Sequence, residues 1–369
     1  MRLILVACLA AFSALCAGAA ERWRVEYFYD PPDLSEFAIT ALEFPSAERG
    51  MAAGTVAVPG RKEKPYAVAT SDGGKTWAPV RLPEVPGSLF FLNEKTGWMT
   101  GRDNVWRTDD FGATWKKLAR INGVLQVYFL DEKHGWAIGA KKTVQETNDG
   151  GATWTAVGAA AEPKTSADNT VYSAIAFATP KAGIIAGSSR PPRRGDNSEF
   201  PDWMDPETGR REWPGLVITL ETRDAGAHWR SSTTSMFGQI TALSLAADGR
   251  GLGLIEFFDK FDYPSEVYSF DLRNGKGGRV FRRKDRAVTD VLVISEGPAY
   301  LAAIEPPGTV FHSPVPGKLK LFRSGDFAEW EEMEVDYRAV GRRATLACPG
   351  KGPVWVATDT GMILKLASE

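Results

Sequence analysis

Cysteine and histidine are scarce in this sequence, which limits the covalent and metal chemistry that it can support. Its 369 residues include only three cysteines and three histidines. Cys8 and Cys16 fall in an N-terminal leader, so we expect Cys348 to remain as a lone thiol without a disulfide partner in the mature chain. Because burial protects a lone thiol in an oxidising compartment, we predict that Cys348 is a core residue and not a nucleophile.

Neither sign of charge predominates. The chain has 44 basic and 46 acidic side chains, which gives a formal net charge of −2 at pH 7. Nucleic-acid binding draws on a surplus of Lys and Arg along one surface, so we expect no nucleic-acid partner. With 43% hydrophobic and 24% charged residues, the composition also excludes a disordered, collagenous or coiled-coil chain.

Long apolar runs are absent after residue 20. Residues 1–20, MRLILVACLAAFSALCAGAA, combine an early cation at Arg2, a short apolar run and a small-residue end. This order is typical of a secretory signal peptide cleaved before Ala20 or Glu21, and the run is shorter than the roughly 20 residues that span a bilayer. We therefore predict a periplasmic or secreted protein that has no membrane span after cleavage.

Four segments share the pattern Ser/Thr-x-Asp-x-Gly-x-Thr-Trp, with His in place of Thr in the last. They are TSDGGKTW (70–77), TDDFGATW (108–115), TNDGGATW (147–154) and TRDAGAHW (222–229), with a decayed copy at 324–330. A short carboxylate accepts backbone N–H groups in a tight turn, glycine takes the positive φ, and the indole buries a large surface at the start of the next strand. We predict a structural role for Asp72, Asp110, Asp149 and Asp224, and for Trp77, Trp115, Trp154 and Trp229.

A second repeat gives the number of units. Pairs of apolar strands joined by a polar turn occur at 42–54, 89–101, 127–139, 175–187, 243–255, 291–303 and 345–357. Four antiparallel strands repeated about every 40 to 50 residues are typical of a β-propeller. The last unit lacks a fourth strand, which RWRVEYFYD (22–30) with Trp23 can supply. We predict an all-β, seven-bladed β-propeller of four-stranded antiparallel blades, a single domain over 21–369 closed by the N-terminal strand.

The Asp-containing segments are similar to the Asp-box, or bacterial neuraminidase repeat. Together with Gly97-Trp98 and Gly135-Trp136, they make the chain resemble the photosystem II stability and assembly factor-like family of secreted seven-bladed propellers. The resemblance implies an exported, non-catalytic binding or assembly factor that contacts an unidentified protein or envelope component. It implies no cofactor, and we expect a monomer. Sialidases and other glycosidases also carry Asp-boxes, so an enzyme stays the alternative.

Blade four contains the largest departure from the repeat, an insertion at about 188–214 that reads SSRPPRRGDNSEFPDWMDPETGRREWP. Long loops in compact domains are commonly functional, although this one can also be decoration. We predict that Arg190, Arg193 and Arg194 make charge-assisted contacts to an acidic partner and that Trp203 is an apolar anchor.

The enzyme alternative depends on the segment IEFFDKFDYPSE. Glu256, Asp259 and Asp262 offer the paired carboxylates of glycoside hydrolysis, and Tyr263 offers a tyrosine nucleophile. No Phe/Tyr-Arg-Ile-Pro segment precedes the first Asp-box, which weakens a sialidase-like reading. The three histidines, His134, His228 and His312, belong to turns on opposite faces of the predicted propeller, so we predict no metal site.

Overall fold

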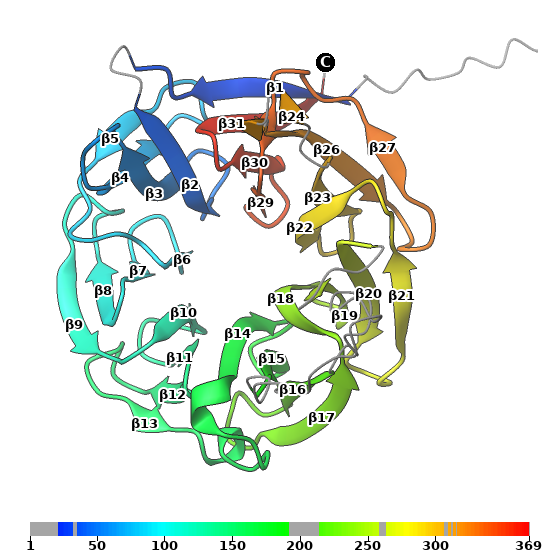
Figure 1. The fold of residues 1–369 in the computed structure, drawn as a ribbon. Coiled ribbons are helices and arrows are strands. Elements are labelled where there is room, and N and C mark those ends of the chain that lie inside the picture. Colours follow the sequence, from blue (N-terminus) through cyan, green and yellow to red (C-terminus); the bar gives the residue numbers. More distant parts are fainter. Residues whose placement is uncertain are drawn as a thin grey trace, which may run out of the picture.

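Seven antiparallel sheets are arranged around a central axis as the blades of a propeller (Figure 1). The structure, a computed structural model, describes residues 21–31, 35–191, 214–257, 263–305, 309–310, 313–314 and 316–368. Blades 1 to 6 each have four strands in chain order, and blade 7 takes its fourth strand from the N-terminal end of the described chain. The first strand of each blade is nearest the axis and the fourth is at the outer rim. This architecture confirms the predicted fold class.

The innermost strands of blades 1 to 7 are β2 (Glu36–Glu43), β6 (Ser88–Phe91), β10 (Val124–Phe129), β14 (Thr170–Phe177), β18 (Gly238–Leu245), β22 (Ala287–Val293) and β29 (Ala344–Ala347). The second strands are β3 (Gly50–Ala57), β7 (Gly97–Thr100), β11 (Gly135–Gly139), β15 (Gly183–Ser189), β19 (Arg250–Phe257), β23 (Ala299–Ile304) and β30 (Trp355–Thr358). The third strands are β4 (Lys64–Thr70), β8 (Asn104–Thr108), β12 (Val144–Thr147), β16 (Gly215–Thr222), β20 (Ser265–Asp271), β26 (Gly317–Ser324) and β31 (Met362–Ser368).

The outer strands are β5 (Ala78–Val80), β9 (Lys116–Arg120), β13 (Thr155–Ala156), β17 (Arg230–Met236), β21 (Gly277–Phe281), β27 (Glu331–Met333) and β1 (Glu21–Phe28). Smaller elements are the 3₁₀ turns η1 (Gly158–Ala160) and η2 (Ala167–Asn169), the hairpin of β24 (Thr309–Val310) and β25 (Ser313–Pro314), and β28 (Val340–Gly341), which pairs with β26.

The N-terminal strand closes the ring as predicted. β1 pairs antiparallel with β31, and Trp23 lies opposite Leu366. The Trp23 side chain is buried in the apolar cluster between blades 6 and 7. Glu21 adds an ion pair to Arg323 of blade 6 at 2.7 Å. Both ends of the described chain are therefore held in one sheet, which leaves blade 7 with the same four strands as its neighbours.

Five inner strands contain a β-bulge, where one residue is left unpaired with the second strand. The unpaired residues are Thr40, Leu125, Ser173, Thr241 and Thr289. The hydroxyl of Ser173 donates to the Ile240 carbonyl at 2.6 Å, and that of Thr289 donates to the Ala344 carbonyl at 2.9 Å. In these two blades the bulge hydroxyl therefore joins an inner strand to the inner strand of the next blade.

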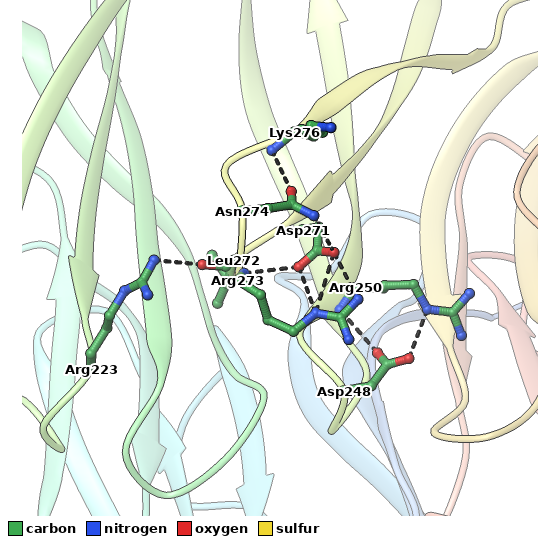
Figure 2. Close-up of polar contacts among 8 residues, drawn as sticks. All are labelled: Arg223, Asp248, Arg250, Asp271, Leu272, Arg273, Asn274 and Lys276. Atoms are coloured by element: carbon green, nitrogen blue, oxygen red, sulfur yellow. Dashed lines mark hydrogen bonds and ion pairs between the residues drawn. The ribbon is translucent and has the colours of Figure 1, made fainter.

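Buried apolar clusters lie at six of the seven seams between blades. At the seam between blades 2 and 3, for example, the Trp98 ring stacks on Phe129 with centroids 3.7 Å apart. The described residues form no such cluster at the seam between blades 4 and 5. There Arg223 of blade 4 reaches across to donate to the Leu272 carbonyl of blade 5 at 2.7 Å (Figure 2). This seam therefore depends on polar contacts.

Candidate functional site

The blade topology sorts the connections onto two faces. Loops between second and third strands, and the connections from each fourth strand to the next blade, lie on one face, which we call the loop face. The turns between first and second strands and between third and fourth strands lie on the opposite face, the Asp-turn face. The four segments at 70–77, 108–115, 147–154 and 222–229, named the Asp turns, all belong to the second face.

In each Asp turn the aspartate carboxylate accepts hydrogen bonds from the turn itself. The Thr76 backbone N–H donates to Asp72 Oδ1 at 2.9 Å, and its hydroxyl donates to Asp72 Oδ2 at 2.6 Å. The Thr70 hydroxyl donates to Asp72 Oδ1 and accepts the Gly74 N–H, both at 2.9 Å. The Thr76 hydroxyl and N–H hold the pKa of Asp72 at about 2. The carboxylate is thus a hydrogen-bond acceptor for the turn.

The other Asp turns repeat this arrangement. Asp110 and Asp149 accept the hydroxyls of Thr114 and Thr153, each at 2.6 Å. In blade 4 the histidine that replaces this threonine takes the same place, because His228 Nδ1 lies 2.7 Å from Asp224 Oδ2. In all four turns the carboxylate therefore accepts hydrogen bonds from its own segment.

The tryptophans that follow the Asp turns belong to the seams. Trp77 and Trp154 donate their indole N–H groups to the carbonyls of Gly74 and Gly151 at 3.1 and 2.9 Å. Trp115 and Trp229 pack against the apolar clusters of blades 1–2 and 3–4. Trp77 and Trp154 also pack against the clusters of blades 7–1 and 2–3.

Glu256 is the one candidate catalytic carboxylate among the described residues. It lies in a strand and is hydrogen-bonded to an arginine. Glu256 is the penultimate residue of β19, and its Oε1 accepts a hydrogen bond from Arg343 Nη2 at 2.7 Å. The Thr241 hydroxyl donates to the same oxygen at 3.2 Å. Asp259 and Asp262 lie outside the described residues. The structure therefore brings Glu256 to an arginine of blade 7.

Tyr263 lies beneath two cations. The Arg282 guanidinium carbon is 4.0 Å from the centre of its ring, and Lys284 Nζ is 5.4 Å away. Arg282 also forms an ion pair with the buried Glu266 at 3.1 Å, where Arg279 joins it at 3.3 Å. The Tyr263 ring thus makes cation–π contacts with both side chains.

Two inner-strand carboxylates were missed by the sequence reasoning. Burial, and then the charge of Asp290, raise the pKa of Glu43 to about 8. Burial also raises the pKa of Asp290 to about 6, although the N–H groups of Leu346 and Val291 donate to it at 2.7 and 2.9 Å. Each is a carboxylate within a predominantly apolar inner strand, and this position was the signal available in the sequence.

The exposed large apolar side chains of the described residues lie on the loop face and are spread over several blades. Among the described residues they are Phe28, Val85, Leu125, Phe237 and Tyr337. Val85, Phe237 and Tyr337 belong to connections that lead from an outer strand to the next blade. Phe28 is the last residue of the outer strand β1, and Leu125 is the bulge residue near the start of β10. Tyr337 is the most accessible, with 80% of its surface exposed. The Asp-turn face carries none of the five.

The insertion of blade 4 also leaves from the loop face, directly after β15. Its first arginine, Arg190, is half-buried, and its backbone N–H donates to the Asn169 carbonyl at 3.0 Å. Arg193, Arg194 and Trp203 lie outside the described residues, so the predicted contacts of the insertion remain a prediction.

Cys348 is half-buried against the cluster between blades 6 and 7 rather than fully enclosed. Burial raises the pKa of its thiol to about 11, which disfavours the thiolate that a nucleophile needs. Within the described ranges no three His, Cys, Asp or Glu side chains are grouped so that they could hold a metal ion. No helix in that part of the chain has the length and apolar character to cross a bilayer.

Comparison with known proteins supports the resemblance seen in the sequence. The family model for the photosynthesis system II assembly factor YCF48 matches residues 117–191, from the outer strand of blade 2 to the start of the blade 4 insertion. No curated protein matches the sequence significantly.

Solved structures match across most of the propeller. YCF48 bound to a D1 peptide gives a TM-score of 0.59 at 14% identity, covering 94% of this chain and 97% of that one. YCF48 from Cyanidioschyzon merolae gives 0.57 at 15% identity, covering 94% and 98%. The β-propeller domain of the Trilobed protease from Pyrococcus furiosus gives 0.54 at 12% identity, covering 90% and 96%. At these identities the structural likeness shows the fold, and the family match confirms the resemblance to the photosystem II assembly factor family.

Proposed function

We propose that this chain, which resembles the photosystem II assembly factor family, is an exported, non-catalytic binding factor that holds a protein partner on its loop face. The observation that carries the proposal is the placement of all five exposed large apolar side chains of the described residues on that face. Exposed apolar and aromatic side chains on one face are typical of protein interfaces, where a few such residues supply most of the binding free energy.

Two further observations support a protein partner. The solved propeller described as YCF48 bound to a D1 peptide shares the fold of this chain, so a ring of this kind can present a peptide site. The insertion of blade 4 leaves from the same face as the apolar side chains, which adds Arg193, Arg194 and Trp203 to the proposed contact set. The partner is then an exported or envelope protein with an acidic and apolar surface.

The proposal is tested by capture of the partner from the native envelope fraction with purified protein. Serine substitutions of Val85 and Tyr337 together should reduce capture at least tenfold, because both side chains are exposed and contribute little to folding. The matched control is the pair Lys75→Ser and Lys351→Ser on the Asp-turn face, which should leave capture unchanged. Equal loss in both pairs would contradict the assignment of the face.

The insertion is tested separately. Replacing residues 191–213 with a short Gly-Ser turn should abolish capture and shift the melting temperature by only a few degrees, since β15 and β16 stay intact. If the partner is still captured after the replacement, the insertion has no role in binding it.

Hydrolysis is the outcome that would overturn the non-catalytic assignment. We expect no turnover of chromogenic glycosides or sialosides, because Glu256 is engaged by Arg343 at 2.7 Å. Turnover that disappears in the variants Asp259→Asn or Asp262→Asn would establish a glycosidase.

A further inference from the structure

β17, the outer strand of blade 4, lacks the protection that the other outer strands have. It is seven residues long, reads RSSTTSM and carries no charge after Arg230. Proteins protect exposed sheet edges with short strands, charges, proline or bulges. The other outer strands each use one of these: β5 and β27 have three residues, β13 has two, β9 and β1 are rich in charge, and β21 has a register shift.

The outer edge of β17 is open in the described part of the chain. All seven residues pair with β16 on the inner side, in an unbroken register from Glu221↔Arg230 to Gly215↔Met236. In such a ladder alternate residues direct their N–H and C=O groups outward. No described backbone group outside β16 bonds to them, and β17 lies at the outer rim of the ring (Figure 1). The side chains from Ser232 to Ser235 are exposed.

The two ends of β17 have different neighbours. At one end the chain continues from Met236 into Phe237, one of the exposed apolar residues of the loop face. At the other end Glu221, the residue opposite Arg230, lines a groove of about 330 Å³ between blades 4 and 5. The groove lies at the seam without a buried apolar cluster, where Arg223 and Leu272 make the contact drawn in Figure 2.

We propose that β17 accepts an extended segment of the protein partner as a fifth, antiparallel strand of blade 4. The inference rests on the proposed function, because it describes how a partner held on the loop face continues down the side of the ring. The segment is six or seven residues long, about 20 Å, uncharged and rich in β-branched residues, with an apolar residue beside Phe237. Backbone hydrogen bonds supply the affinity in this mode of recognition, so a strand of Ser and Thr is a suitable acceptor.

The test uses amide hydrogen exchange on the full mature chain. The probe is an end-blocked heptapeptide that begins with Phe and continues with alternating Val and Thr, because the first residue of an antiparallel strand lies beside the C-terminal end of β17. The control peptide has Pro at its second and fourth positions. In the free protein, alternate amides of 230–236 should exchange quickly. The probe should slow them at least tenfold, and the control peptide, which lacks two donors, should not.

Variants separate this site from the rest of the loop face. Thr233→Lys and Ser235→Lys place charges on exposed positions of the edge and should weaken probe binding at least tenfold without unfolding the blade. Thr155→Lys, on the exposed outer strand β13, is the matched control and should bind the probe normally.

Three results would overturn the inference: all seven amides protected in the free protein, protection that grows with protein concentration alone, or probe binding unchanged in the Lys variants. The second result would assign the edge to another copy of this chain. Capture of the native partner distinguishes the two proposals. If the Val85 and Tyr337 variants lose the partner while the β17 variants retain it, only the strand proposal fails; if the loop-face variants retain it, the proposed function fails.

Discussion

Arg343 of blade 7 donates a hydrogen bond of 2.7 Å to Glu256 of blade 5, so one ion pair passes over the inner end of blade 6 on the loop face. Arg343 precedes β29 and Glu256 nearly ends β19, which places both at the same end of their blades. The pair joins two blades that share no seam. It also occupies the one described carboxylate that the sequence proposed for catalysis.

The Arg343–Glu256 pair should contribute modestly to stability. Because the two side chains are 56% and 27% exposed, solvent screens their attraction. A double-mutant cycle of Arg343→Gln and Glu256→Gln, measured by urea unfolding, should give a coupling free energy of about 0.5–1 kcal/mol. The coupling should shrink in 0.5 M salt. Zero coupling at low salt would show that the contact has no energetic role.

Glu43 should make stability depend on pH. Its folded pKa of about 8 lies above the ordinary value of 4.5, so the folded protein holds this proton more firmly than the unfolded chain does. The stabilisation is complete below about pH 4.5 and is lost as the pH rises through about 8. Asp290, with a pKa of about 6, adds a loss of the same sign at lower pH.

The variant Glu43→Gln tests this expectation. It should flatten the fall in the free energy of unfolding between pH 5 and 8 and be more stable than the parent at pH 8, by on the order of 1–3 kcal/mol. Glu63→Gln, at an exposed loop position, is the control and should leave the slope unchanged. A parent protein whose stability rises over this range would contradict the assignment.

Gly74 should tolerate no side chain because it packs on the tryptophan of the neighbouring blade. A Cβ at this position would lie 2.3 Å from the Trp355 ring, and the residue has a φ of +91°. Gly60 has a φ of +74° but nothing within 4 Å, so it isolates the cost of the backbone conformation. Gly60→Ala should lose about 1–2 kcal/mol, and Gly74→Ala should lose about 2 kcal/mol more, measured by chemical denaturation. Equal losses would mean that Trp355 moves aside freely.

The seam between blades 4 and 5 should open before the other seams. It lacks a described apolar cluster, so native-state hydrogen exchange should show less protection in β18 than in β10 or β22. Arg223→Ala removes the contact to the Leu272 carbonyl and should speed exchange in β18 further. Arg49→Ala removes a similar contact, 3.0 Å to the Glu94 carbonyl, at a seam that has an apolar cluster, and should change little. Equal protection from hydrogen exchange in all inner strands would show that this seam opens no earlier than the others.

Much of the scaffold could be predicted from the sequence, because its turns are held by hydrogen bonds between residues of the same short segment. The Asp turns are local, since Asp72 bonds to Thr70 and Thr76 in the same eight residues. A repeated local motif therefore predicted the turns, the blade count and, through Trp23, the strand that closes the ring. Glu256 shows the limit: its segment suggested a loop carboxylate, but its partner lies 87 residues away in another blade.

The sequence by itself determined the seven-bladed ring, because periodic strands and turn residues follow from short-range sterics and hydrogen bonding. Only the tertiary structure decided which side chains share a face, since closing a ring brings together residues that are distant in the chain. The pKa of Glu43 is raised by burial in the closed ring and then by Asp290 of blade 6. The apolar set from Phe28 to Tyr337 is scattered through the sequence. The open edge of β17 is likewise a property of the closed ring, because a strand is an edge only when no other strand pairs beside it.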